Sequence, residues 1–113
     1  MYMYSKYLLW LTLIIFVLHI KVEAQWQATT GPSQPNVVAV ATSGTNTFAA
    51  AASTVSHTPN NGTNWSLASN GLVGAIYSLA TKGTDLFAGA GGGAVFQSSD
   101  NGANWTNTST GLA

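Results

Sequence analysis

Three tryptophans recur at nearly equal intervals in this chain: Trp26, Trp65 and Trp105 lie 39 and 40 residues apart. When the sequence is aligned with itself on these residues, the run VATSGTNTFAA at 40–50 matches LATKGTDLFAG at 79–89. A second match, between 58–65 and 98–105, follows after one residue is gained in a glycine-rich loop. Periods of about 40 residues are typical of arrays in which each repeat is one small supersecondary unit.

The second match carries a polar motif. Residues 98–105 read Ser-x-Asp-x-Gly-x-x-Trp, and residues 58–65 read Thr-x-Asn-x-Gly-x-x-Trp. Asx and hydroxyl side chains accept hydrogen bonds from nearby backbone N–H groups in tight turns, and glycine permits a positive φ there. We therefore expect two structural turns, each followed by a tryptophan that packs beside the next unit. The residues concerned are Thr58, Asn60, Gly62 and Trp65, and Ser98, Asp100, Gly102 and Trp105.

Each repeat also predicts four short strands separated by turns. The first strands are apolar and partly β-branched, as expected of buried strands, and no stretch after residue 24 has a helical period. The predicted strands are 36–42 and 75–81, then 47–51 and 86–90, then 55–58 and 94–98, with the fourth opening at Trp65 and Trp105. The expected class is all-β, with two four-stranded antiparallel blades and part of a third of a β-propeller. The repeats span about 26–64 and 65–104, and the partial third spans 105–113.

The polar motif resembles the Asp box of BNR-like repeat proteins. Such boxes occur in sialidases, sortilin-type receptors, xyloglucan-degrading enzymes and propeller proteins similar to the photosystem II assembly factor. The run 86–105 most resembles the last type, as found in secreted bacterial repeat proteins. The resemblance implies a propeller, typically of 4–8 blades, whose boxes are structural. Two box-bearing repeats cannot close such a ring, so we expect a piece of a larger propeller. Self-association and a small open solenoid are the alternatives.

The first 24 residues have the features of a secretory signal peptide. Lys6 provides a positive start, residues 8–20 are apolar, and Val22 and Ala24 suit a small-residue cleavage site. The alternative is a membrane anchor, but a spanning helix needs about 20 apolar residues, and this run is shorter. We expect a signal-peptide helix cleaved after Ala24, no stable membrane span afterwards, and a secreted, periplasmic or cell-surface location for residues 25–113.

Composition excludes one class of partner. Charged residues make up 5% of the chain, the net charge is zero and there is no arginine. Nucleic-acid binding requires clustered basic side chains, so we expect no nucleic-acid partner. Cysteine is also absent, so stability must come from packing, backbone pairing or association rather than from disulfides.

The candidate catalytic residues are few. Hydrolysis of a glycoside usually needs two placed carboxyl groups, and after residue 24 only Asp85 and Asp100 carry one. We expect them about 10 Å apart, with Asp100 engaged in its turn and without the further carboxylates that a cation site needs. His57 is expected to be a plain strand histidine and Tyr77 a core residue.

The sequence therefore predicts no catalytic, cofactor or metal site. The expected function is a non-catalytic exported scaffold or binding module for a protein or glycan ligand. Two alternatives stay open: a piece of a secreted glycoside hydrolase that lacks its catalytic residues, and a structural array that associates with copies of itself.

Overall fold

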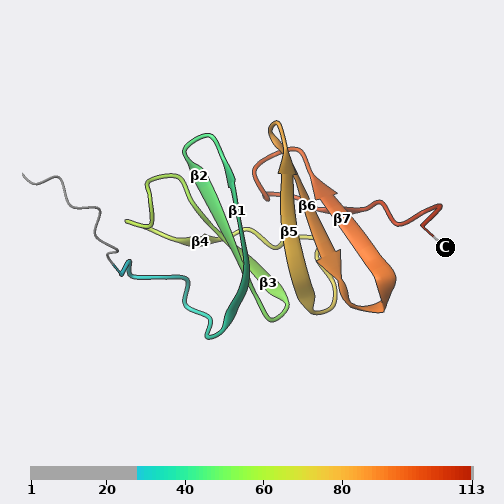
Figure 1. Ribbon diagram of the computed structural model, residues 1–113, viewed down its shortest axis with the longest axis horizontal. Helices are drawn as coiled ribbons and strands as arrows, with labels where there is room; N and C mark the ends of the chain where they lie inside the picture. Colours follow the sequence, from blue (N-terminus) through green and yellow to red (C-terminus); the bar gives the residue numbers. More distant parts are fainter. Residues whose placement is uncertain (1–27, 113) are drawn as a thin grey trace, which may run out of the picture.

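The computed structural model describes residues 28–112, and this part of the chain forms two antiparallel sheets (Figure 1). Within each sheet, every strand pairs with the next one along the chain. The first sheet contains β1 (Val37–Ser43), β2 (Asn46–Ala51), β3 (Thr54–Thr58) and β4 (Ser66–Leu67), and the second contains β5 (Ile76–Lys82), β6 (Asp85–Ala90), β7 (Ala94–Ser98) and β8 (Thr106–Asn107). The predicted all-β class is confirmed, and the first three strands of each sheet begin and end within one residue of their predicted bounds.

The signal peptide predicted at residues 1–24 lies outside the described residues. Within 28–112 the one helical element is a 3-10 turn, η1 (Gly91–Gly93), between β6 and β7. No helix in that range is long and apolar enough to cross a membrane.

Two-residue turns set the register of the first hairpin in each sheet. Ser43 pairs with Asn46 across a turn that begins at Gly44, whose φ is 60°. Lys82 and Asp85 enclose the matching turn at Gly83, whose φ is 61°. A glycine with positive φ in the first turn position matches the natural twist of a hairpin, which explains why the strand ends could be placed from sequence.

The first strand of each sheet is not buried as predicted. No residue of β1 is buried, and in β5 only Ile76 is. Both strands lie at an edge of their sheets, and the register with the next strand shifts at Val38 and at Tyr77. Such β-bulges redirect side chains locally. Tyr77, which was predicted to be a core residue, is 67% exposed, so that prediction is wrong.

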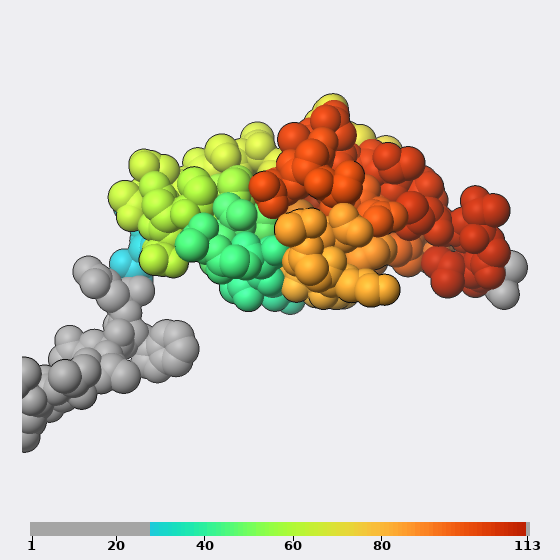
Figure 2. Space-filling model, turned by 90° about the horizontal axis from the view of Figure 1, so that it is seen from above, coloured from blue at the N-terminus to red at the C-terminus, as the bar shows by residue number. Residues whose placement is uncertain are grey.

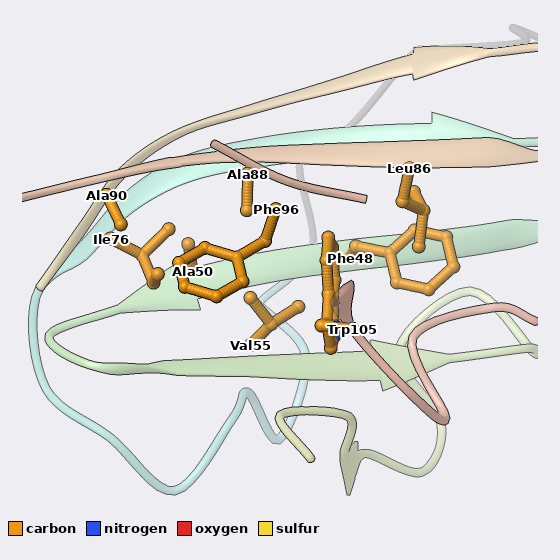
Figure 3. Close-up of a cluster of buried hydrophobic side chains, with 9 residues drawn as sticks. All are labelled: Phe48, Ala50, Val55, Ile76, Leu86, Ala88, Ala90, Phe96 and Trp105. Atoms are coloured by element: carbon orange, nitrogen blue, oxygen red, sulfur yellow. The ribbon is translucent and has the colours of Figure 1, made fainter. Parts of the chain in front are cut away.

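The core lies between the sheets rather than inside one of them. Figure 3 shows its side chains filling the space between the strands, and Figure 2 shows the first sheet, in green, in direct contact with the second, in orange. Burial of this shared apolar surface is the main favourable term available to hold the two sheets together. The cluster comprises Phe48, Ala50, Val55, Ile76, Leu86, Ala88, Ala90, Phe96 and Trp105.

The sequence repeat and the sheets are out of phase. Thr106 and Asn107, in the fourth strand predicted to open at Trp105, pair with Gln97 and Phe96 and so form the outer strand of the second sheet. The equivalent strand β4 completes the first sheet in the same way. A repeat counted from its tryptophan therefore begins with the outer strand of the preceding sheet, and the described residues contain two sheets.

Candidate functional site

The motif at residues 98–105, called the second box below, forms a closed turn directly after β7; the motif at 58–65 is the first box. The hydroxyl of Ser98 accepts a hydrogen bond from the Gly102 N–H at 2.9 Å and donates to Asp100 Oδ1 at 2.8 Å. The Asp100 carboxylate also accepts from Asn104, whose backbone N–H is 2.9 Å from Oδ1 and whose Nδ2 is 3.0 Å from Oδ2. The polar side chains of this box are thus engaged within their own turn.

These hydrogen bonds also set the charge of the turn. They lower the pKa of the Asp100 carboxyl, and the largest contribution comes from the side chain of Asn104, followed by the Asn104 N–H and by Ser98. Donated hydrogen bonds favour the ionised form of a carboxyl group. Asp100 is therefore a carboxylate near neutral pH and is poorly suited to act as a general acid.

The first box repeats this geometry except for the bond that the side-chain amide of Asn104 makes in the second. The Thr58 hydroxyl accepts from the Gly62 N–H at 2.9 Å and donates to Asn60 Oδ1, also at 2.9 Å. The same Oδ1 accepts the backbone N–H of Asn64 at 3.0 Å. Asn60 thus keeps the acceptor that the motif requires and lacks the second carboxylate oxygen that Asn104 contacts in the other box.

Beyond its own turn, the second box holds the chain segment that joins the two sheets. This segment, residues 68–72, is called the connector below. The indole N–H of Trp105 donates to the Ala68 carbonyl at 2.7 Å, and the backbone N–H of Trp105 donates to the Asn70 carbonyl at 2.9 Å. The Asn70 side chain donates to Asn104 Oδ1 at 2.7 Å. Trp105 is only 5% exposed and packs against the preceding unit, because the connector crosses the box turn on its way to β5.

Trp65 occupies the same position in the first box but has different surroundings. Here Thr29 takes the place of Ala68: a Cβ added at Gly62 would lie 2.8 Å from Thr29 Cβ, and the Thr30 hydroxyl is 3.5 Å from the Gly62 carbonyl. Among the described residues, nothing accepts the buried indole N–H of Trp65. A cavity of about 330 Å³ lies beside Trp65, between residues 30–33 and the outer strand of the first sheet.

The remaining candidate residues make their side-chain contacts with residues outside the boxes. His57 stacks on Phe48, with ring centroids 4.9 Å apart, and its Nε2 is 2.8 Å from Asn46 Oδ1. Burial lowers the pKa of His57. In the second sheet Gln97 replaces the histidine and lies 3.4 Å from Asp85 Oδ2.

Asp85 and Asp100 share no hydrogen-bond partner in the structure. Residues 28–112 also contain no group of three or more histidine or acidic side chains that could hold a metal ion. The hydrogen bonds described for Asp85, Asp100 and His57 thus do not link these candidate residues to one another.

Sequence reasoning overlooked the connector. A signal was available, because Ser-x-Gly-Leu occurs at both 69–72 and 109–112. Its small, uncharged residues carry no evident chemistry, and the connector acts through the backbone carbonyls of Ala68 and Asn70, which any residue type would supply.

Comparison with known proteins shows a structural likeness in the fold. No protein-family model and no curated protein matches the chain. A solved structure described as YCF48 bound to D1 peptide superposes with a TM-score of 0.53 at 21% sequence identity, covering 63% of this chain and 25% of that one. YCF48 is a β-propeller photosystem II assembly factor, and the chain spans about a quarter of its length. The likeness shows a propeller-like fold and leaves membership of the Asp-box repeats a prediction.

Proposed function

We propose that the chain is a non-catalytic binding or scaffold module of propeller type, which holds an extended polypeptide segment against its box turns. The observation that carries this proposal is the pair of hydrogen bonds by which Trp105 binds the connector. Two N–H groups of Trp105 bind the carbonyls of Ala68 and Asn70, so the contact recognises backbone rather than a particular side chain. Recognition of extended peptides through main-chain hydrogen bonds is a recurrent mode of binding.

The nearby solved structure supports a peptide as the class of ligand. YCF48 is bound to a D1 peptide, so a propeller of this fold can take a polypeptide ligand. We call the turns of the first and second boxes the Trp65 turn (residues 58–65) and the Trp105 turn (residues 98–105). The Trp65 turn has the same N–H donors as the Trp105 turn, and the Trp65 indole N–H has no acceptor among the described residues. We propose this turn as the binding position.

The surroundings of the acidic residues support a non-catalytic role. Asp100 is engaged by Ser98 and Asn104, and Asp85 lies against Gln97. We propose that the eight box residues shape turns and contribute no chemistry. This proposal predicts no glycosidase activity on sialoside or xyloglucan substrates.

Export is part of the proposal and rests on sequence alone. The pattern of residues 1–24 favours a cleaved signal peptide and a secreted, periplasmic or cell-surface location. Sequencing the N-terminus of the protein recovered from its producing cells should give Gln25 as the first residue. Recovery of an uncleaved chain in the membrane fraction would favour the anchor instead.

The binding proposal can be tested with a peptide that copies the connector and its flanks, residues 66–74. Titration calorimetry of the chain with this peptide should show saturable binding, because the peptide supplies carbonyls in the arrangement that Trp105 already binds. Trp65→Phe removes the indole N–H that would bind a peptide carbonyl and should therefore weaken binding of this peptide. Absence of binding to a chain whose circular dichroism shows folded sheets would refute the proposal.

A further inference from the structure

The connector has a local structure of its own before it reaches the second sheet. The Ser69 hydroxyl accepts the Val55 N–H at 2.8 Å, and the Ala68 N–H donates to the Val55 carbonyl, also at 2.8 Å. The Leu72 N–H then donates to the Ser69 carbonyl at 3.0 Å. The first two bonds fix the connector on β3, and the third closes a turn within the connector.

Residues 108–112 reproduce this structure at the end of the second sheet, and we call them the second connector. The Ser109 hydroxyl accepts the Val95 N–H at 2.8 Å, the Thr108 N–H donates to the Val95 carbonyl at 2.8 Å, and the Leu112 N–H donates to the Ser109 carbonyl at 3.0 Å. The second connector therefore presents its carbonyls in the same way as the first.

The two connectors differ in what covers them. Gly71 and Gly111 share a positive φ, 95° and 90°, but the Trp105 carbonyl lies directly over Gly71, whereas nothing lies within 4 Å of a Cβ placed at Gly111. Leu72 packs against the core, while Leu112 is 60% exposed. The second connector is thus built for a contact that it does not make within the described residues.

The complementary surface lies at the other end of the molecule. The Trp65 turn has the backbone of the Trp105 turn, with Gly62 at a φ of 86° and Gly102 at 81°. Its indole N–H lacks the acceptor that Trp105 finds in Ala68. Within residues 28–112, one end of the pair of sheets thus presents the backbone carbonyls of the second connector, and the other holds a buried donor without an acceptor.

We propose that the second connector of one copy binds the Trp65 turn of a second copy, in the arrangement that joins the two sheets within one chain. Thr108 would supply the carbonyl for the Trp65 indole N–H, and Thr110 would lie against Asn64 as Asn70 lies against Asn104. This inference rests on the proposed function and names the polypeptide that the turn holds. The contact is heterologous, so copies add head to tail and form a ring or an open array.

Steric fit and charge both permit this contact. Residues 28–31 occupy the surface of the Trp65 turn in the structure: Thr29 lies against Gly62, and the Thr30 hydroxyl is 3.5 Å from the Gly62 carbonyl. The second connector of another copy would displace these residues. Thr29 shows that a threonine fits where Ala68 sits in the internal junction, so Thr108 fits as well. Among residues 28–112 the Lys and acidic side chains are Lys82, Asp85 and Asp100, none of them on either surface, so like charges do not oppose the approach.

Cross-linking tests the proposal directly, because the chain has no cysteine of its own. Asn64→Cys and Thr110→Cys are made as separate full-chain variants, mixed, and treated with a short thiol-specific cross-linker. The expected result is a covalent heterodimer joined through positions 64 and 110, identified by mass spectrometry of the linked peptides. The double variant Asn70→Cys/Asn104→Cys is the matched control, since its intramolecular link reports that the reagent spans this geometry. Ser53→Cys mixed with Thr110→Cys reports random encounters.

The outcomes separate the two proposals. Linkage of positions 64 and 110 well above the Ser53 mixture, and lost on adding Trp65→Phe, supports head-to-tail docking. Linkage no greater than the Ser53 mixture, while positions 70 and 104 link normally, overturns it. If the connector peptide still binds in that case, the binding function stands and only the identity of the partner is wrong; if the peptide also fails to bind, both proposals fall.

Discussion

The indole nitrogen of Trp105 lies 2.7 Å from the carbonyl oxygen of Ala68, 37 residues away, and this bond joins the box turn of one sheet to the connector that follows the outer strand of its neighbour. Both partners are buried, with Ala68 6% and Trp105 5% exposed. Because this hydrogen bond is buried and joins residues from different sheets, it fixes the position of one sheet on the other.

Trp105→Phe should therefore destabilise the fold. The substitution leaves the Ala68 carbonyl buried without its donor, which costs about 1–3 kcal/mol, in addition to lost packing. Urea unfolding followed by circular dichroism measures the effect. Trp65→Phe is the matched control, because its indole N–H has no acceptor among the described residues, and it should cost less. Equal losses in the two variants would contradict a specific role for the Ala68 bond.

Asp100→Asn should change the acid stability of the protein while leaving the turn in place. The folded pKa of Asp100 is lowered below its usual value of about 3.9, so the folded state binds fewer protons than the unfolded state in that range. The stabilisation is fully present above the unfolded pKa and is lost as the pH falls through the folded pKa.

Thermal melts between pH 5 and pH 2 should therefore show a steeper loss of stability for the natural protein than for Asp100→Asn. The variant reproduces the first box, where Asn60 accepts the same bonds from Thr58 and Asn64. Asp100→Ala, which removes all acceptors, should be less stable than Asp100→Asn at every pH. Superimposable acid profiles for the natural protein and Asp100→Asn would show that the carboxylate has no such role.

Local signals explain which parts of the fold could be predicted. The strand ends followed from the glycine turns at Gly44 and Gly83, and the box turns follow from side chains that bond within four residues of their own position, such as Ser98 to Gly102. Each of these features depends on residues close together in sequence, where spacing and residue type decide the geometry.

Features that depend on contacts distant in sequence could not be predicted. Tyr77 has the apolar neighbours of a core strand, yet a bulge at an edge strand turns it outward. Trp65 and Trp105 belong to the same motif, but only the structure shows that Ala68 accepts one indole N–H while the other has no acceptor among the described residues. Sequence alone does not state which segment will lie against a given turn.

His57→Gln should remove a pH dependence between about pH 7 and pH 5. Burial lowers the folded pKa of His57 below its unfolded value, so the neutral form is favoured in the fold. Stability is therefore present above the unfolded pKa and is lost as the pH falls through the folded pKa. Glutamine occurs at the equivalent position, Gln97, where it bonds to Asp85, so the variant should fold. Melting curves across this range should slope for the natural protein and be flat for His57→Gln, and a slope retained in the variant would assign the effect elsewhere.

Gly102→Ala should be more damaging than the same change in a hairpin turn. Both Gly102 and Gly44 have a positive φ, 81° and 60°, so alanine costs about 1–2 kcal/mol at either site from backbone strain. At Gly102 the new Cβ would also lie 2.9 Å from Ala68 Cβ, whereas nothing lies within 4 Å at Gly44. Overpacking of this kind typically adds about 1–3 kcal/mol. Chemical denaturation of the two variants should therefore rank Gly102→Ala below Gly44→Ala, because only the first change pushes the connector away from the Trp105 turn. If the two variants unfold at the same denaturant concentration, the close approach of Ala68 to Gly102 does not hold the sheets together.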